Sequence, residues 1–414
     1  FLFLKIGNLM SLKSKQFSLL LYDVRARNIG FQAFIIACLI FSIWWLADNT
    51  LTNLDNRGKS LGFGFLTQTA GFEISDTLGT WLFDYQVGIS SYTDIYFIGI
   101  TNTLLIAILG IVLASVIGFS VGIMRLSNNI VLKYFATFYV EIIRNVPLLL
   151  QLFFWYFAVL GVLPNARSQL EFFGGIGGLN ITGLYIPKPI FQSGFSFVFF
   201  AFVASLIIVF ALIRYSRKKQ DEVGQGLNLL LIVPAAIIVV TGAAYFLCGS
   251  PLDWSLPVFK DSGPIFKRGF QSENGMVLVP EMLAVLLALT LYTAGFIAEI
   301  VRAGILAVSK GQTEASYSVG LRPGITLRLI VIPQAMRIII PPLTSQYLNL
   351  TKNSSLAVAI AYPELVSIFA GTALNQVGKE IEMIFMVMTT YLAFSLITSL
   401  FMNWFNARVK IVER

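Results

Sequence analysis

The stretch SKGQTEASYSVGLRPGITLRLIVIPQ, residues 309–334, is polar and punctuated by glycine and proline, yet strongly apolar segments lie on both sides of it. Its first half has the composition of a short helix, with Thr313 suited to the N-cap, Glu314 to the first turn and Gly320 to the C-terminal stop. The Pro-Gly pair that begins at Pro323 favours a sharp turn before a second, apolar piece. A helix, a tight turn and a stiff return predict a rigid elbow, which transmits force as a flexible connector cannot.

The chain around this elbow is too apolar for a soluble protein. Of its 414 residues, 57% are hydrophobic and 12% are charged, and the mean hydropathy is +0.79. Soluble domains carry about 25% charged residues. No soluble core could bury so much apolar surface, so the solvent for most of the chain is lipid. The sequence contains no histidine, which excludes most zinc sites and most histidine-based catalytic pairs.

Eight apolar runs approach the roughly 20 residues that a helix needs to cross a bilayer. They fall at about 29–47, 96–123, 134–162, 190–213, 227–248, 277–302, 333–350 and 384–405. A ninth, shorter run, SLAVAIAYPELVSIFAG from Ser355, is interrupted by Pro363 and Glu364 and reads as a re-entrant or surface-lying piece. The sequence therefore predicts an all-α polytopic membrane protein with about eight transmembrane helices.

The distribution of charge predicts the orientation of these helices. With the N-terminus in the cytosol, the cytosolic pieces are 1–30, 125–133, 214–226, 302–337 and 406–414. These pieces hold 19 Lys or Arg against 5 Asp or Glu, whereas the rest of the chain holds 10 against 16. Positive charge favours the cytosolic side, so both termini and the elbow are predicted to be cytosolic. The basic run from Arg214 acts as an orientation determinant, with contact to anionic lipid or a partner as the second interpretation.

The elbow also resembles a known family. EASYSVGLRPGITLRLIVIP, from Glu314, is similar to the signature loop of permease subunits in binding-protein-dependent ABC importers. That pattern reads Glu-Ala-Ala, three residues, Gly, nine residues, Ile, one residue, Leu-Pro; here Ser316 and Ile332 depart from it without changing the spacing. In that family the loop docks on a cytosolic ATPase. The resemblance implies that the contact is made by Lys310, Gly311, Gln312, Glu314, Ala315, Ser316, Gly320, Arg322 and Pro323.

Four further stretches resemble the polar amino acid branch of the family, which includes histidine, glutamine and general L-amino acid permeases. They are TNTLLIAILG from Thr101, EIIRNVPLLLQLFFWY from Glu141, LYTAGFIAEIVRAGILAVSKGQ from Leu291 and IPQAMRIIIPPLTSQYLNLTKNSSLA from Ile332. The resemblance implies a five-helix type I permease core. Its expected organisation is 1–50 (cytosolic N-terminus and extra first helix), 51–94 (external loop), 95–163 (first part of the core), 164–276 (insertion with two additional transmembrane helices) and 277–414 (second part of the core, elbow at 309–333).

The energy source is expected to lie outside this chain. The nearest approach to a phosphate-binding loop is NLDNRGKS, where Asn53 replaces the first glycine and the stretch falls in the predicted external loop. The chain is therefore not expected to be an enzyme or to bind a cofactor or metal. The resemblance implies a partner ATPase dimer that holds ATP and Mg, a second permease (a sister chain or a copy), an external amino-acid-binding protein and a bacterial-type inner membrane. No nucleic-acid partner is expected.

Two similar tetrads place charges inside predicted spans, where ionisable groups are costly and often functional. EIIR contains Glu141 and Arg144, and EIVR contains Glu299 and Arg302, each pair at helical i, i+3 spacing. One interpretation is that these are structural ion pairs that fix helix ends. The other is that Glu299 binds a substrate ammonium group. Gln151, deeper in the third span, is either a pathway residue or a packing residue.

The polar run YLNLTKNSS, from Tyr347, predicts a break in the seventh span. Asn349, Thr351, Asn353 and Ser354 offer donors and acceptors for an amino acid, and transporters often place broken helices at substrate sites. The alternative is that this run is the external end of the helix. The overall interpretation is an amino acid permease subunit of an ATP-driven importer. An ion-driven secondary transporter is the rival, although neither inverted repeats nor deep carboxylates are evident.

Overall fold

The computed structural model describes residues 24–224, 226–260, 264, 268–271 and 274–409. The predicted cytosolic segment before residue 24 and the last five residues lie outside the described residues. The chain divides into two units, residues 1–63 and residues 64–414, which are described separately.

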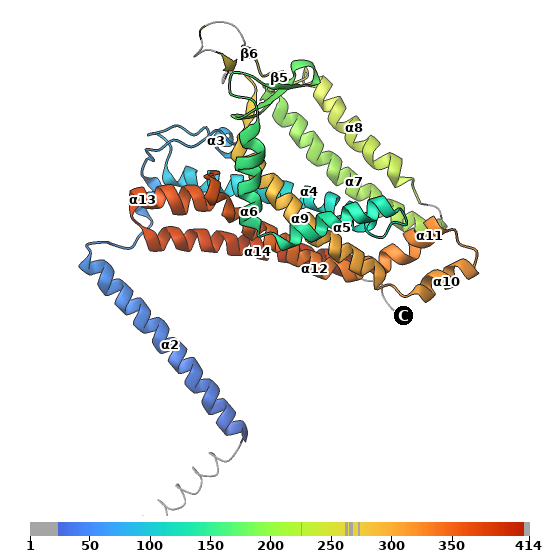
Figure 1. Cartoon of the computed structure of the whole chain (residues 1–414), viewed down its shortest axis with the longest axis horizontal. Coiled ribbons are helices and arrows are strands. Elements are labelled where there is room, and N and C mark those ends of the chain that lie inside the picture. The colour runs from blue at the N-terminus through green and yellow to red at the C-terminus, as the bar shows by residue number, and fades with distance from the viewer. Residues whose placement is uncertain (1–23, 225, 261–263, 265–267, 272–273, 410–414) are drawn as a thin grey trace, which may run out of the picture. The chain divides into compact units, whose positions relative to one another are not determined.

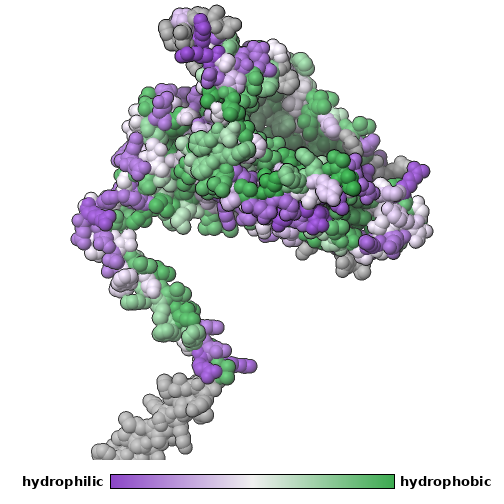
Figure 2. All heavy atoms as spheres, in the orientation of Figure 1, coloured by the Kyte–Doolittle hydropathy of each residue, from purple (hydrophilic) through white to green (hydrophobic). Residues whose placement is uncertain are grey.

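The described part of the first unit is one long helix, α2 (Val24–Asn56), followed by non-helical residues 57–63. Its side chains are nearly all exposed, including large apolar ones such as Phe34, Phe41 and Trp44. Figure 2 shows an apolar middle with hydrophilic residues at both ends of this helix. Residues 27–56 are long and apolar enough to span a membrane. An exposed apolar helix of this kind is stable only when lipid or a partner covers it, as expected for the extra first span.

The second unit is a helical body (Figure 1). Its described helical segments are η1 (Gly64–Thr67), α3 (Leu78–Leu82), α4 (Tyr92–Met124), α5 (Ile130–Asn145), α6 (Leu148–Phe153), η2 (Phe154–Val159), η3 (Leu160–Val162), η4 (Phe173–Gly175), α7 (Phe195–Val223), α8 (Leu229–Leu247), α9 (Pro280–Leu306), α10 (Lys310–Ser318), α11 (Pro323–Thr326), η6 (Leu327–Val331), α12 (Ile332–Asn353), η7 (Ser354–Ile360), η8 (Val366–Ala373), α13 (Leu374–Val377) and α14 (Glu380–Val409).

The number of candidate spans confirms the predicted membrane fold. Among the described residues, six helices are long and apolar enough to cross a bilayer: α2, α4, α7, α9, α14 and the stretch 323–360 around α12. The pair formed by α5 with residues 148–162 would be a seventh, bent by 109°, and α8 is a shorter apolar helix. The bend follows Asn145 and coincides with Pro147, which lacks an N–H and disfavours helical backbone at the preceding residue.

A seam of small residues on α4 lets α9 approach closely. Gly110, Ala114, Gly118 and Gly122 recur every four residues and therefore share one helix face; Gly118 and Gly122 face α9, whereas Gly110 faces Leu350 of α12. A Cβ added at Gly118 would lie 2.6 Å from the Cβ of Ile297 on α9. Such seams are typical of helix pairs in membranes, where association depends on close packing. The α4–α9 pair forms the centre of the larger buried core, to which α6 and α12 also contribute.

The chain between α12 and α14 is irregular and is held by a buried carboxylate. Glu364 is fully buried, and its oxygens accept hydrogen bonds from the backbone N–H groups of Val366 and Ser367, both at 2.8 Å, and from the Tyr391 hydroxyl at 3.1 Å. The side chain of Asn102 on α4 donates to the carbonyl of the residue before Glu364 at 2.7 Å. The carboxylate thus caps the start of η8 and ties this segment to α14.

The insertion contains strands that the all-helical expectation did not include. The described strands are β1 (Leu170–Phe172), β2 (Gly177–Asn180), β3 (Gly183–Ile186), β4 (Lys188–Phe191), β5 (Leu252–Ser255), β6 (Phe259–Lys260), β7 (Gly269–Phe270) and β8 (Met276–Leu278). They form an antiparallel sheet in the order β1-β2-β3-β8 and two short ribbons, β4–β5 and β6–β7. The insertion also contains the packed helices α7 and α8, of which α7 is long and apolar enough to span a membrane and α8 is a shorter apolar helix. Strands this short carry too weak an alternation of apolar residues to be recognised in sequence.

Candidate functional site

The elbow between α9 and α12 lies at one end of the helical body, which we call the α10 end (Figure 1). α10 ends where Gly320 adopts a φ of +79°, a left-handed conformation that glycine accepts without strain. The N–H of Gly320 donates to the carbonyl of Tyr317 at 2.9 Å, and the N–H of Leu321 donates to the carbonyl of Ser316 at 3.1 Å. These two bonds form a Schellman stop, as the sequence predicts for Gly320.

Two side-chain contacts make the elbow stiff. The Ser316 hydroxyl, which is buried, donates to the Thr326 hydroxyl at 2.9 Å and so joins α10 to α11. The Gln334 amide donates to the Gln312 amide oxygen at 3.2 Å and so joins α12 to α10. These contacts connect α10 to α11 and to the start of α12.

The start of α10 differs from the expectation. The helix begins at Lys310 with Ser309 at the N-cap position, so Thr313 is not the cap and Glu314 lies beyond the first turn. The helix extends one turn further because Lys310, Gly311 and Gln312 all accept helical geometry and no residue before Thr313 prevents it. The residues expected to contact the ATPase are exposed at Lys310, Gly311, Gln312, Glu314, Ala315, Gly320, Arg322 and Pro323, whereas Ser316 is buried.

Sequence reasoning missed the apolar side chains of this surface. Tyr317 is 49% exposed and Val319 is 74% exposed, beside the exposed polar residues of α10. Apolar side chains at the rim of a polar loop are typical of protein contacts, where aromatic residues often dominate the binding energy. Tyr317 and Val319 are apolar residues in an otherwise polar stretch, and this contrast in the sequence could have indicated the contact surface.

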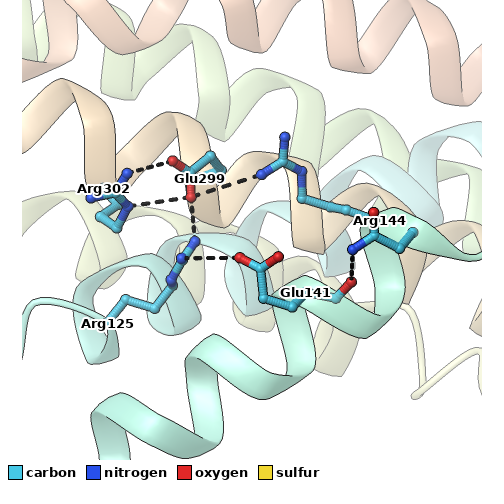
Figure 3. Close-up of polar contacts among 6 residues, drawn as sticks. Arg125, Glu141, Arg144, Glu299 and Arg302 are labelled. Atoms are coloured by element: carbon cyan, nitrogen blue, oxygen red, sulfur yellow. Dashed lines mark hydrogen bonds and ion pairs between the residues drawn. The ribbon is translucent and has the colours of Figure 1, made fainter.

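The charged tetrads meet in one cluster at the same end of the body (Figure 3). Glu299 on α9 accepts hydrogen bonds from Arg302 at 2.6 Å and 3.2 Å and forms a close ion pair with Arg125 at the end of α4. Arg144 on α5 approaches Glu299 to 4.0 Å, and its guanidinium lies 5.4 Å from the ring centre of Phe296. The cluster therefore joins α4, α5 and α9.

One of the two expected pairings within a tetrad is wrong. Glu299 pairs with Arg302, as predicted, but Glu141 pairs with Arg125 at 3.8 Å, and Arg144 turns toward Glu299 (Figure 3). The reason is tertiary: the α4 terminus brings in a third guanidinium that competes for both carboxylates. Arg125 is only 9% exposed and was not among the predicted residues. The Glu299 carboxylate is occupied by arginines, which is the arrangement expected of a structural ion pair.

Gln151 lies at the bend between α5 and α6. Its side-chain amide donates to the carbonyls of Ile143 and Val146, both at 2.9 Å. The terminal carbonyls of a helix lack intrahelical hydrogen-bond donors, and the Gln151 amide provides the missing donors across the bend. The side chain is buried, so its geometry favours the packing interpretation over the pathway interpretation.

The predicted break in YLNLTKNSS comes only at the end of this run: α12 remains helical through Asn353, and η7 begins at Ser354. Thr351 and Ser354 are buried: the Thr351 hydroxyl donates to the carbonyl of Tyr347 at 2.9 Å, and that of Ser354, the first residue of η7, donates to the carbonyl of Thr351 at 2.7 Å. The helix persists because buried Leu350 continues the apolar face toward the core, and the first irregular backbone comes at η7. The exposed face carries Ser345, Asn349 and Lys352, and Asn353 is half-buried.

Comparison with known proteins gives a clear result, although no protein-family model matches the chain. YhdX of Escherichia coli strain K12, by name an amino-acid ABC transporter permease, is 48% identical over 384 residues, covering 93% of this chain and 94% of YhdX. The chain belongs to the family of amino-acid ABC transporter permeases. AapQ of Rhizobium johnstonii, a general L-amino acid transport system permease protein, is 45% identical over 95% of this permease and 95% of AapQ.

A third relative of the permease is BztB of Rhodobacter capsulatus, a glutamate/glutamine/aspartate/asparagine transport system permease protein. It is 35% identical over 96% of this chain and 97% of BztB. Membership confirms the function predicted from the elbow: the chain is a permease subunit of an amino-acid ABC importer. It also favours ATP-driven transport over an ion-driven secondary transporter. The relatives are permease subunits rather than enzymes.

The permease allows a direct test of Gln151. Replacement of Gln151 by leucine removes two hydrogen bonds at the bend and is expected to cost about 1–3 kcal/mol of stability. Thermal unfolding of the purified protein in detergent measures this loss, with leucine at exposed Gln192 as the control. Unchanged thermal stability with reduced transport would instead assign Gln151 to the substrate pathway.

Proposed function

We propose that this permease carries L-amino acids inward across a bacterial-type inner membrane, powered by a separate cytosolic ATPase dimer that holds ATP and Mg. The observation that carries this proposal is the elbow: an exposed helix, α10, that is hydrogen-bonded through Gln312 to α12. ATP-driven closure of the dimer moves α10, and the stiff elbow passes that movement to the membrane helices. A flexible loop would absorb it.

The substrate pathway is proposed to follow the polar face of α12. Ser345, Asn349 and Lys352 lie on one exposed face because their spacing matches two turns of helix. An exposed ammonium within a span is too costly to face hydrocarbon, so this face borders a water-filled path or another subunit. Of the residues predicted for the pathway, Asn349 and Asn353 remain in the proposal. Thr351 and Ser354 hold the helix from inside.

The partners follow from this arrangement and from the family. A single polar helix face cannot enclose a path, so a second permease completes it, and we propose a different sister chain. An external binding protein delivers the amino acid. The names of AapQ and BztB refer to general L-amino acids and to glutamate, glutamine, aspartate and asparagine. We propose a similarly broad range of polar amino acids for this permease.

Reversing the charge of Glu314 tests the elbow. Glu314 is exposed, so arginine at this position leaves the fold intact while placing an altered charge in the ATPase contact. We expect the ATPase that co-purifies in mild detergent to fall by about tenfold or more, as for residues central to an interface. Mass spectrometry of the purified material measures it, together with ATP-dependent amino acid uptake into proteoliposomes.

The matched control is Glu222→Arg, the same exchange at an exposed site near the end of α7. This variant should retain both the ATPase and uptake. Equal retention of the ATPase in Glu314→Arg and the control would refute the docking role of α10. A wild-type chain that purified alone and moved amino acids under an ion gradient would refute the importer.

A further inference from the structure

Two oppositely charged side chains lie at the accessible edge of the charged cluster. The side chain of Glu141 is 60% exposed and that of Arg144 is 38% exposed, and both belong to α5 at i, i+3 spacing. Each is held loosely: Glu141 reaches Arg125 at 3.8 Å, and Arg144 reaches Glu299 at 4.0 Å. Neither contact is short enough to saturate the carboxylate or the guanidinium.

The centre of the cluster, by contrast, is saturated with positive charge. Glu299 is shared by Arg125 and Arg302 at close range, and three guanidiniums face only two carboxylates. The Nε of Arg125 is buried and has no hydrogen-bond partner among the described residues. The cluster therefore has a surplus of donors, and an additional carboxylate at its edge would find guanidinium groups already in place.

The depth of the cluster indicates what the edge can face. Glu299 lies seven residues before the end of α9, or roughly 10 Å along the helix axis. Charged side chains within a membrane span are costly to expose to lipid, and Glu141 and Arg144 belong to the same cluster as Glu299. Glu141 and Arg144 consequently border a water-filled cavity or another protein surface. The first of these is where an amino acid leaving the permease toward the cytosol would pass.

We propose that Glu141 and Arg144 form a binding site for the zwitterionic part of an α-amino acid at the cytosolic end of the pathway. The substrate ammonium group binds the Glu141 carboxylate, and the substrate carboxylate binds the Arg144 guanidinium. The proposal rests on the proposed function. The site binds the two charged groups that all amino acids share, rather than the side chain.

Recognition of only the two charged groups would allow the proposed broad range of amino acid substrates. Charge-assisted hydrogen bonds to the ammonium and carboxylate groups are the same for every substrate, and none of the residues named here selects a side chain. The site also binds product on the cytosolic face, so a high cytosolic amino acid concentration occupies it and slows release.

The test uses the full complex of permease, sister permease and ATPase in lipid nanodiscs, without the binding protein. Bound radiolabelled L-glutamine is displaced by L-glutamine, by L-glutaminamide, which lacks the carboxylate, and by N-acetyl-L-glutamine, which lacks the ammonium group. We expect Glu141→Gln to lower the affinity for L-glutamine by about tenfold while leaving the affinity for the N-acetyl compound unchanged. Arg144→Gln should lower the affinity for L-glutamine similarly while leaving the affinity for L-glutaminamide unchanged.

The controls are Lys218→Gln and Glu222→Gln, which change an exposed ion pair at 3.7 Å on α7. Neither control should alter the affinity for any of the three ligands. Equal effects on all ligands, or no effect, would overturn the site while ATP-dependent uptake by the wild type continued to support the importer. Loss of the sister permease from both variants would assign the pair to a subunit contact and overturn the site. Absence of ATP-dependent uptake by the wild type would refute the proposed function, and this site with it.

Discussion

Replacement of Gly118 by valine is expected to prevent the permease from folding into a stable body. A Cβ at this position would lie 2.6 Å from both the Cβ and the Cγ2 of Ile297, and 3.0 Å from the carbonyl oxygen of Ala294. Ile297 is fully buried, and side chains in close-packed interiors have little room to move. One extra methylene group in a packed core costs about 1–3 kcal/mol, and valine adds three carbons at the closest point of the seam.

The measurement is the yield of monodisperse protein and its midpoint of thermal unfolding. Gly242→Val is the matched control, because a Cβ at Gly242 on α8 has no atom within 4 Å. The alanine variant, Gly118→Ala, should lie between wild type and valine. Normal yield and stability for Gly118→Val would mean that α4 and α9 are not packed as closely as the seam requires.

Replacement of Glu299 by glutamine is expected to have the second-largest effect. Arg125 and Arg302 would lose their shared carboxylate, and Arg125 is too buried to recover the loss from water. Removal of one partner from a buried ion pair typically costs about 3–5 kcal/mol, and the 25% exposure of Glu299 places the expected loss near the lower end, about 3 kcal/mol.

Thermal unfolding distinguishes the two interpretations of Glu299. A structural role predicts a lower unfolding midpoint, which is partly restored when Arg302→Gln is added because fewer unpaired charges remain. A substrate role predicts an unchanged midpoint with impaired uptake. The latter result would return Glu299 to the set of substrate-binding residues and contradict its assignment as the centre of the cluster.

The elbow was predictable because its information is local. Gly320 permits the left-handed stop of α10, and the polar composition of residues 309–322 separates this stretch from the spans on either side. The tight turn expected at Pro323 and Gly324 is instead the first turn of α11, a position that the fixed φ of proline also suits. The error at Thr313 amounts to one helical turn, because α10 begins at Lys310 and includes Gly311 and Gln312 before Thr313. Helix boundaries depend on small differences in free energy and are less certain than helix existence.

The charged cluster was only half predictable. The i, i+3 spacing of Glu299 and Arg302 indicates their contact from sequence alone, and the structure contains it. The same spacing misassigned Glu141 and Arg144, because the competing guanidinium of Arg125 comes from another helix. The contact between Arg125 and Glu299 joins the ends of α4 and α9, which are far apart in the chain, and no local sequence pattern predicts it.

The sequence by itself determined the membrane fold class, most of the apolar spans and the elbow, because hydropathy, charge bias and glycine or proline conformation act within one segment. The eight apolar runs correspond to six spanning helices, a seventh bent pair and the shorter helix α8 among the described residues. The tertiary structure alone decided which charges pair, that α12 stays helical through Asn353, and that Gln151 closes a bend. These outcomes depend on contacts between distant segments, where a few ångströms decide which partner a polar group finds. Such distances are set by packing, such as the glycine seam of α4 against α9.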